Sequence, residues 1–234
     1  MSTPILVSWS GGKDSALALY RILQDPSWQV VGLLCTISQP YNRITMHGVR
    51  RALLEQQIAA IDCAPVIPIL LPPDASNERY EAAWAAALHP FVEQGVQHVA
   101  FGDIFLEDIR AYREQQLTRL GMTPVFPIWT GSRRRTDSLA LLDAFWQAGF
   151  RTRIVCVDSR HLSPEWAGRE LTPEALQELP ETVDPCGENG EFHTFVFDGP
   201  LFQHPVRHRL GRRVTRRGFH FRDLLPACPA SPPT

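Results

Sequence analysis

The chain has 234 residues, of which 44% are hydrophobic, and its formal net charge is −2. This length fits one large domain or two small ones, and the apolar fraction is sufficient for a sizeable core. The small net charge argues against a dedicated nucleic-acid-binding protein. No run of 18 or more apolar residues occurs, so we expect no transmembrane helix and no membrane partner.

The N-terminus and the cysteines indicate a cytoplasmic protein. Residues 1–4 carry no basic segment of the kind that opens a signal peptide. The five cysteines are widely spaced and contain no C-x-x-C pair. This pattern predicts reduced thiols, and neither a structural zinc site nor an iron–sulfur cluster is expected.

In the first half of the chain, apolar runs of strand length alternate with segments of helical periodicity. The expected strands are residues 5–7, 30–37, 66–71 and 99–101, and the expected helices are residues 14–24, 49–61, 77–94 and 107–120. Residues 41–48 are expected to form a loop. Repeated β–α units predict an α/β fold with a Rossmann-like, doubly wound parallel sheet.

The pattern changes near residue 123. We expect a strand at 125–129 broken by Pro127, a helix at 137–148 and a strand at 153–157. Thr172 before Pro173 is typical of a helix N-cap, and residues 180–200 are rich in turn signals. The sequence therefore predicts a first domain at 1–124, a smaller α+β domain at 125–225 and a disordered tail at 226–234.

Residues 207–222 contain seven arginines and no acidic residue. The rest of the chain consequently carries a net charge of about −9. This segment is either a patch for an anionic partner or the solvated face of a terminal strand, and the second interpretation is the more common one for a run of charge.

Lys13 is the single lysine of the chain and lies in the loop Ser10-Gly11-Gly12-Lys13-Asp14-Ser15. Two glycines allow the backbone to approach an anion, and the helix start behind them offers free N–H groups. Ser10 and Ser15 add hydroxyl donors, and Asp14 beside a polyphosphate implies a bridging Mg²⁺ or a structural anchor. The loop is not a Walker A motif, because Val7 and Asp14 occupy positions where that motif needs Gly and Ser or Thr.

The loop resembles the PP-loop of the ATP pyrophosphatases, which split ATP into AMP and pyrophosphate by way of an adenylate. Two further segments resemble the diphthine–ammonia ligase family within that superfamily. They are Gly102-Asp103-Ile104 with Glu107-Asp108-Ile109-Arg110, and Pro185-Cys186-Gly187-Glu188-Asn189-Gly190-Glu191-Phe192-His193-Thr194 followed by Asp198-Gly199-Pro200. The resemblance covers residues 4–222. It implies that the domain at 1–124 binds ATP and that the smaller domain at 125–225 binds the substrate.

Asp103 follows the fourth strand, where ligands of doubly wound sheets bind, so it is a candidate ligand of Mg²⁺; the alternative is a helix N-cap. Glu188 and Glu191 flank a glycine and are candidates to bind Mg²⁺, to hold ammonium or to take its proton; the alternative is a solvated acidic turn. His47 is a candidate nucleotide contact or a helix-capping residue, and His193 is a candidate substrate contact or a packed strand residue.

Together these interpretations predict a complete site. The catalytic candidates are Lys13, Asp14, Asp103, Glu188 and Glu191. The ATP-binding candidates are Ser10, Gly11, Gly12, Lys13, Asp14, Ser15 and His47. The substrate-binding candidates are Glu188, Glu191, His193 and Thr194, and the metal candidates are Asp14 and Asp103.

The resemblance implies an ATP-dependent ligase that uses ammonia as nitrogen donor, with ATP and Mg²⁺ as cofactors. The acceptor it implies is the carboxylate of diphthine, a modified histidine on elongation factor 2. One alternative is the same chemistry on a small-molecule carboxylate, such as a cobalamin-pathway acid. A second alternative is a nucleotide-binding sensor without catalysis. The presence of Lys13, Asp14, Asp103 and Glu191 argues against this alternative. A tRNA sulfurtransferase would require paired cysteines and a basic surface, which are not evident.

Overall fold

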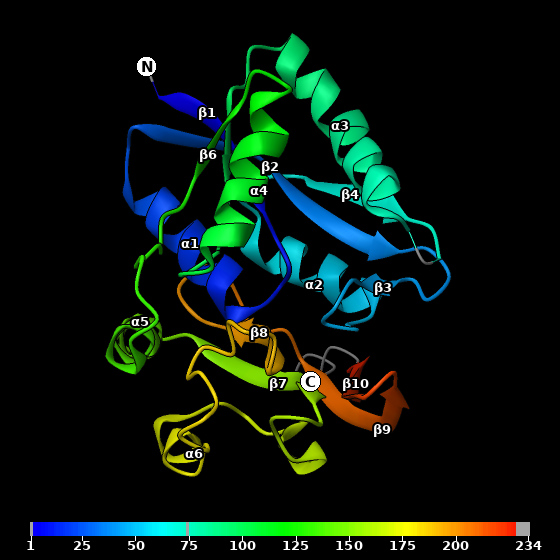
Figure 1. The fold of residues 1–234 in the computed structure, drawn as a ribbon, viewed down its shortest axis with the longest axis vertical. Helices are drawn as coiled ribbons and strands as arrows, with labels where there is room; N and C mark the ends of the chain where they lie inside the picture. The colour runs from blue at the N-terminus through cyan, green and yellow to red at the C-terminus, as the bar shows by residue number, and fades with distance from the viewer. Residues whose placement is uncertain (1, 74, 228–234) are drawn as a thin grey trace, which may run out of the picture.

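The computed structural model describes residues 2–73 and 75–227 (Figure 1). Its first sheet has six strands: β1 Thr3–Ser8, β2 Trp28–Ser38, β3 Arg43–Ile44, β4 Val66–Leu71, β5 His98–Ala100 and β6 Thr123–Val125. The order is β3-β2-β1-β5-β6, with β4 also paired to β2. Apart from the two-residue β3, which is antiparallel to β2, all pairings are parallel. The predicted Rossmann-like parallel sheet is therefore confirmed.

Four helices cover the two faces of this sheet: α1 Lys13–Gln24, α2 Arg51–Ile61, α3 Asn77–Glu93 and α4 Glu107–Thr118. Side chains alternate along a strand, and β1 shows the result directly. Ile5 and Val7 join a core with α1 and α2, whereas Leu6 joins a second core with α3 and α4. Because both faces are covered, the central strands are apolar throughout, as the sequence predicts.

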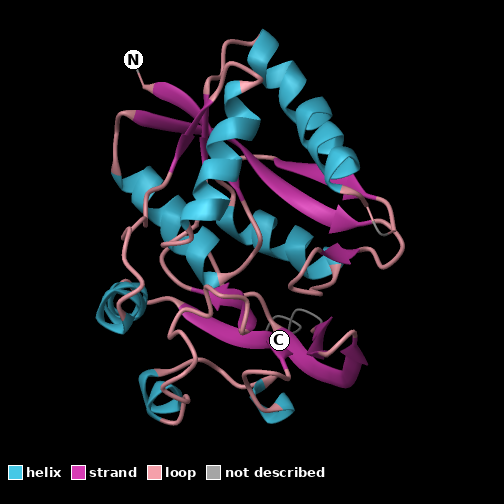
Figure 2. Cartoon of the chain, viewed as in Figure 1, coloured by secondary structure: helices cyan, strands magenta, loops and turns pink. Residues whose placement is uncertain are grey.

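The second sheet is antiparallel and follows the order β8-β7-β10-β9. Its strands are drawn in magenta in the lower half of Figure 2. The elements of this half are α5 Arg135–Gln147, β7 Arg151–Asp158, a 3₁₀ turn at Pro164–Trp166, α6 Pro173–Gln177, β8 Phe192–Asp198, β9 His208–Arg216 and β10 Phe219–Pro226. The predicted N-cap of α6 is confirmed, because Thr172 Oγ1 accepts a hydrogen bond from the N–H of Ala175 at 3.2 Å.

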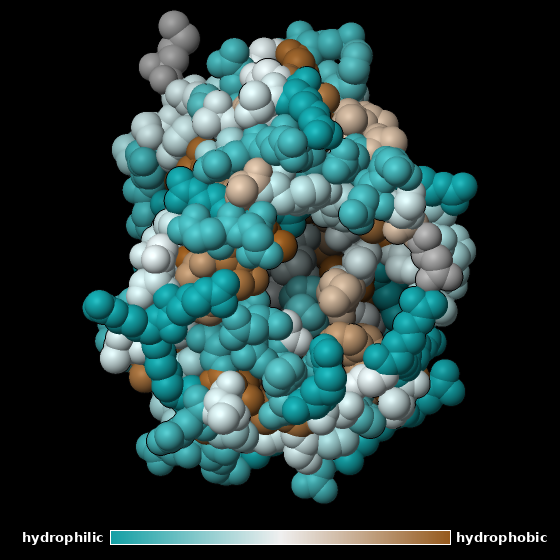
Figure 3. All heavy atoms as spheres, viewed as in Figure 1, coloured by the Kyte–Doolittle hydropathy of each residue, from teal (hydrophilic) through white to brown (hydrophobic). Residues whose placement is uncertain are grey.

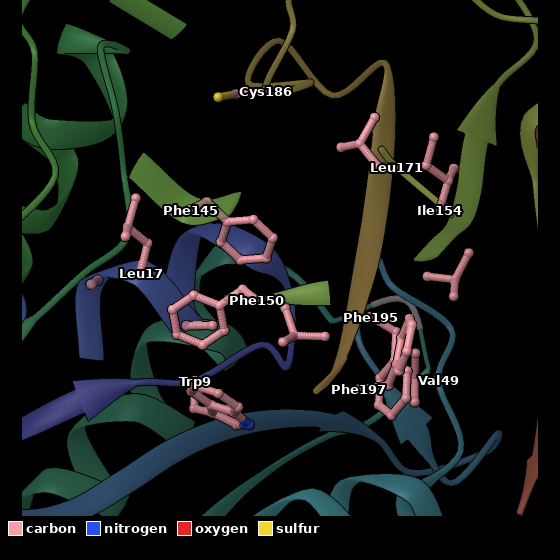
Figure 4. Packing of buried hydrophobic residues seen from close by; sticks show 14 of the residues in the cluster. Trp9, Leu17, Val49, Phe145, Phe150, Ile154, Leu171, Cys186, Phe195 and Phe197 are labelled. Carbon is pink, nitrogen blue, oxygen red and sulfur yellow. The ribbon is translucent and has the colours of Figure 1, made fainter. Parts of the chain in front are cut away.

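The two halves share one hydrophobic core. Helix α1 contacts β8 and helix α2 contacts β10, so both helices lie between the two sheets (Figure 1). Phe145 and Phe150 stack with ring centroids 4.9 Å apart and belong to the same cluster as Trp9 and Leu17 of the first half (Figure 4). The second sheet is thus packed against the start of α1, where the predicted phosphate loop lies.

Four sequence expectations need correction. The loop expected at 41–48 contains the two-residue strand β3, which pairs with β2. The strand expected at 125–129 is instead β6 at Thr123–Val125, which pairs with β5. Pro127 has no N–H to donate to a sheet, and the chain turns there. The N–H of Trp129 donates to the Phe126 carbonyl at 3.2 Å in this turn. The turn-rich stretch 180–200 contains strand β8. Of the tail expected at 226–234, Pro226 ends β10 and residues 228–234 lie outside the described residues.

The arginine-rich segment forms the β9–β10 hairpin at the open edge of the second sheet. Six of its arginines are exposed, as a solvated strand face requires; binding of an anionic partner there stays a prediction. None of the four cysteines within 2–73 and 75–227 forms a disulfide. No helix in the same ranges is long and apolar enough to cross a membrane.

Candidate active site

The loop between β1 and α1 is anchored to two other elements. Gly11 has a φ of 75°, a left-handed conformation that glycine adopts at little cost. Its carbonyl accepts hydrogen bonds from the N–H of Val196 in β8, at 2.9 Å, and from Nε2 of Gln57 in α2, at 3.0 Å. A Cβ at Gly11 would lie 2.6 Å from Gln57 Oε1, so the loop needs glycine for space as well. These contacts fix the loop without a ligand.

The two serines of the loop lie at the N-terminus of α1. Ser10 Oγ is 3.2 Å from Ser15 Oγ and accepts a hydrogen bond from the N–H of Gly12 at 3.3 Å. Ser15 Oγ donates to the Gly12 carbonyl at 3.0 Å. The helix dipole and the N–H groups of the first turn favour an anion at this position.

Lys13 and Asp14 form an ion pair at the helix start. Lys13 Nζ donates to both carboxylate oxygens of Asp14, at 2.8 and 2.7 Å. The Lys13 side chain is 4% exposed and that of Asp14 is 32% exposed, so the carboxylate forms the outer member of the pair. Burial by itself would lower the pKa of Lys13, but Asp14 raises that pKa to about 12. Lys13 is therefore a fixed positive charge at neutral pH.

Asp103 follows β5, next to β1 in the sheet. The chain leaves β1 and β5 toward opposite sides of the sheet. The carboxyl ends of these two strands therefore form the point where ligands of doubly wound sheets bind. A Cβ at Gly102 would lie 2.8 Å from the carbonyl carbon of Asp14 and 2.9 Å from the nitrogen of Ser15. Glycine thus allows this segment to touch the loop backbone, which brings Asp103 beside the start of α1.

Glu188 reaches the same place from the second half of the chain. Its Oε1 accepts a hydrogen bond from the N–H of Ile104 at 2.8 Å. Burial, together with the nearby Asp14 and Asp103 carboxylates, raises the pKa of Glu188 to about 8. Burial likewise raises the pKa values of Asp14 and Asp103. Glu188 is therefore close to two other carboxyl groups, Asp14 and Asp103, and to Lys13.

Glu191 is more deeply buried than Glu188 and stabilises the turn in which it lies. It is 2% exposed, and its Oε1 accepts hydrogen bonds from the N–H of Asp184 and from Nδ2 of Asn189, both at 3.0 Å. Oε2 of Glu191 is buried and has no hydrogen-bond partner among the described residues. The structure gives Glu188 a direct contact with the segment after β5, and gives Glu191 contacts within the turn.

Two histidines and Thr194 line the other side of the loop. The N–H of Lys13 donates to Thr194 Oγ1 at 3.0 Å, and His47 Nδ1 donates to the Thr194 carbonyl at 2.8 Å. A Cβ at Gly12 would lie 2.6 Å from His47 Cε1. Burial lowers the pKa of His47 to about 4 and that of His193, whose ring centroid is 4.9 Å away, to about 3. Both rings are neutral at pH 7, and His193 Nε2 is buried without a partner in the described chain.

These contacts join both halves of the chain in one site. Figure 3 shows this face hollowed near its centre, between the parts that carry the two sheets. The loop from β1 to α1 passes through the same region of the view (Figure 1). The structure thus brings together the predicted site residues other than Glu191, whose hydrogen bonds lie within its own turn.

The carboxylates fit Mg²⁺ by chemistry. The described residues contain no group of three or more His, Cys, Asp or Glu side chains arranged to hold a metal ion by themselves. Mg²⁺ is usually bound by one or two carboxylates together with substrate phosphates, so such a group is not required. Oδ2 of Asp103 is buried and lacks a hydrogen-bond partner within the described residues, which leaves it available to a cation.

Sequence reasoning missed three residues that organise the site. Gln57 resembles an ordinary polar helix residue, and Arg113 resembles a solvent-facing arginine on a polar helix. Asp184 directly precedes the segment 185–194 that resembles the family. Its carboxylate accepts hydrogen bonds from the N–H groups of Cys186 and Glu188 at 3.0 and 3.1 Å. Burial raises the pKa of the Cys186 thiol, which keeps this thiol protonated and unreactive near neutral pH.

Comparison with known proteins agrees with this geometry. The family model of the diphthamide synthase N-terminal domain matches residues 3–124, and that of the diphthamide synthase C-terminal domain matches residues 137–222. A curated diphthine–ammonia ligase of Danio rerio is 32% identical over 138 residues, which cover 56% of this chain. The chain matches about half of that relative's length, 51%. Because the first family model alone spans more than half of the chain, this protein belongs to the diphthamide synthase family.

Proposed function

We propose that this protein is an ATP-dependent ligase of the diphthine–ammonia ligase type, which joins ammonia to a carboxylate and releases AMP and pyrophosphate. The observation that carries the proposal is the meeting of Lys13, Asp103 and Glu188 at the carboxyl ends of β1 and β5. The similarity to a diphthine–ammonia ligase supports it. ATP, ammonia and Mg²⁺ are the cofactor and substrates that this reaction requires.

In the first half-reaction, the N-terminus of α1 and the serine hydroxyls bind the phosphates of ATP. An oxygen of the acceptor carboxylate forms a bond to the α-phosphorus, and the bond from that phosphorus to the bridging oxygen of pyrophosphate breaks. Lys13, which stays positive across the physiological range, stabilises the charge that develops on pyrophosphate. Asp14 and Asp103 would hold Mg²⁺, which neutralises phosphate charge when bound.

In the second half-reaction, the nitrogen of ammonia forms a bond to the acyl carbon, and the bond from that carbon to AMP breaks. Ammonium must lose a proton before its nitrogen can attack. A base works best when its pKa is close to the working pH, and the pKa of Glu188 is about 8. We assign Glu188 the role of this base, and Glu191 the support of its turn together with a substrate contact through Oε2. His47, with Nδ1–H bonded to Thr194, offers Nε2 as an acceptor for the nucleotide. His193 and Thr194 would face the substrate.

The acceptor is either protein-borne diphthine on elongation factor 2 or a small-molecule carboxylate, and we propose a cytoplasmic location without a membrane or nucleic-acid partner. A nucleotide sensor without catalysis is less consistent with the site, because a sensor has no use for a carboxyl group of raised pKa beside the phosphate loop.

The test is acceptor-dependent formation of AMP. The protein is incubated with ATP, Mg²⁺ and ¹⁵N-ammonium, candidate acceptors are added singly, and the products are separated by chromatography and mass spectrometry. AMP, pyrophosphate and a ¹⁵N-labelled amide in equal amounts support the proposal, and Asp103→Asn should abolish all three. ADP as the main nucleotide product would show that the wrong phosphorus has been assigned.

A further inference from the structure

Arg113 lies on α4 directly behind Asp103. Its Nε is 3.8 Å from Asp103 Oδ2, and both atoms are buried without a hydrogen-bond partner among the described residues. A hydrogen bond between such charged groups is shorter, about 2.7–2.9 Å. The two groups therefore attract each other without a bond, and Oδ2 keeps its lone pairs for another ligand.

The guanidinium of Arg113 is held on its other sides by three residues. Nη1 donates to Tyr80 Oη at 3.2 Å, which ties α4 to α3. The guanidinium carbon lies 4.8 Å from the ring centroid of Phe101 and 5.7 Å from that of Trp84. Aromatic faces stabilise a desolvated cation and restrict its orientation. The positive charge is thus fixed in place behind one carboxylate.

We propose that Arg113 is a positioning residue, which directs the Asp103 carboxylate toward the Mg²⁺ that accompanies ATP. This inference rests on the part of the proposed function in which the site binds ATP together with Mg²⁺, because that binding gives Asp103 a metal to hold. The contrast with Asp14 supports it: both oxygens of Asp14 already accept hydrogen bonds from Lys13, whereas Asp103 has a buried oxygen without one.

The alternative is that Arg113 only packs α4 against α3. Arg119 provides a matched control, because its Nη1 also joins these helices, through Glu81 Oε2 at 3.1 Å, and it is not part of the site. If packing is the whole role, Arg113→Met and Arg119→Met should have similar effects. If positioning is the role, Arg113→Met alone should change the dependence on Mg²⁺.

The experiment measures binding without turnover. Calorimetry with a non-hydrolysable ATP analogue is carried out without Mg²⁺ and then across a Mg²⁺ titration. We expect Arg113→Met to raise the Mg²⁺ concentration for half-saturation by roughly 10- to 100-fold, the effect of losing a residue that orients a metal ligand, while metal-free affinity for the analogue is unchanged. Arg113→Lys keeps the charge but not the fork, so it should restore part of the effect.

Tyr80→Phe keeps Arg113 and removes the hydrogen bond that aims it, so it should give a smaller shift in the same direction if Arg113→Met does not fold. Unchanged Mg²⁺ dependence in the folded Arg113→Met or Tyr80→Phe variant, or an equal shift in Arg119→Met, overturns the proposal. A wild-type protein that binds the analogue with Mg²⁺ yet makes no AMP would contradict the proposed function and leave this inference standing.

Discussion

Replacing Glu188 by glutamine should make the protein more stable and less active at the same time. Gln keeps an oxygen that can accept the Ile104 N–H hydrogen bond and removes the negative charge beside Asp14 and Asp103. The folded protein holds the Glu188 proton up to a pKa of about 8, whereas the unfolded chain releases it near 4.5. The contribution of Glu188 to the stability of the wild type therefore falls as pH rises between these two values.

The size of the effect follows from the difference between the folded and unfolded pKa values. A tenfold change in proton affinity corresponds to about 1.4 kcal/mol, so the charged carboxylate costs the folded state at most about 5 kcal/mol above pH 8 and about 3 kcal/mol at pH 7. Glu188 is only partly shielded from solvent, so smaller measured values are expected. Glu188→Gln should show no gain near pH 4.5 and a growing gain above it.

Urea denaturation at about pH 5, 7 and 8.5 measures the stability difference, with Glu181→Gln as a control at an exposed position of the same segment. Amide formation, assayed at constant free ammonia, should fall by roughly 10²–10⁴-fold, the range for loss of a general base. The wild-type rate should rise with pH through about 8. A stability difference that is the same at all three pH values would refute the raised pKa and with it the assignment of the base.

Three further outcomes are expected. Lys13→Arg should abolish AMP formation while leaving circular dichroism unchanged, because the Lys13 side chain is only 4% exposed and the larger planar guanidinium would displace the phosphate-binding loop around it; wild-type turnover would contradict this. Gly102→Ala should lower the free energy of unfolding by roughly 1–3 kcal/mol, because its Cβ would press on the backbone at the start of α1; an unchanged thermal midpoint would argue against that contact. The contribution of His47 and His193 to stability should be lost as pH falls from about 6.5 to 4, since the unfolded chain binds protons that these two buried rings do not bind in the folded state; measured relative to the double variant with glutamine at both positions, the wild type should therefore lose stability over that range.

The sequence by itself determined the kind of fold and the location of the phosphate loop. Helical and strand periods are local properties, so β1, α1 and the following units could be recognised from residues that are near one another in the chain. The loop could be recognised for the same reason: two glycines, a lysine and two serines lie within six residues. Strand β8 was not predicted, because turn residues lie on both sides of its short apolar run. The strand expected at 125–129, around Pro127, was placed too far along the chain, beyond the true position of β6.

Only the tertiary structure decided which residues meet. Glu188 and Asp103 are far apart in the chain, and neither residue shows by its type that a shared site raises its pKa. Glu188 and Glu191 look equivalent in sequence, yet one reaches the segment after β5 and the other bonds to its own turn. Gln57 and Arg113 gave no sequence signal, because a polar residue on a helix faces solvent unless folding places another element over it. Burial and contacts between distant segments set the charges and hydrogen bonds of this site, and they exist only once the second sheet packs against α1.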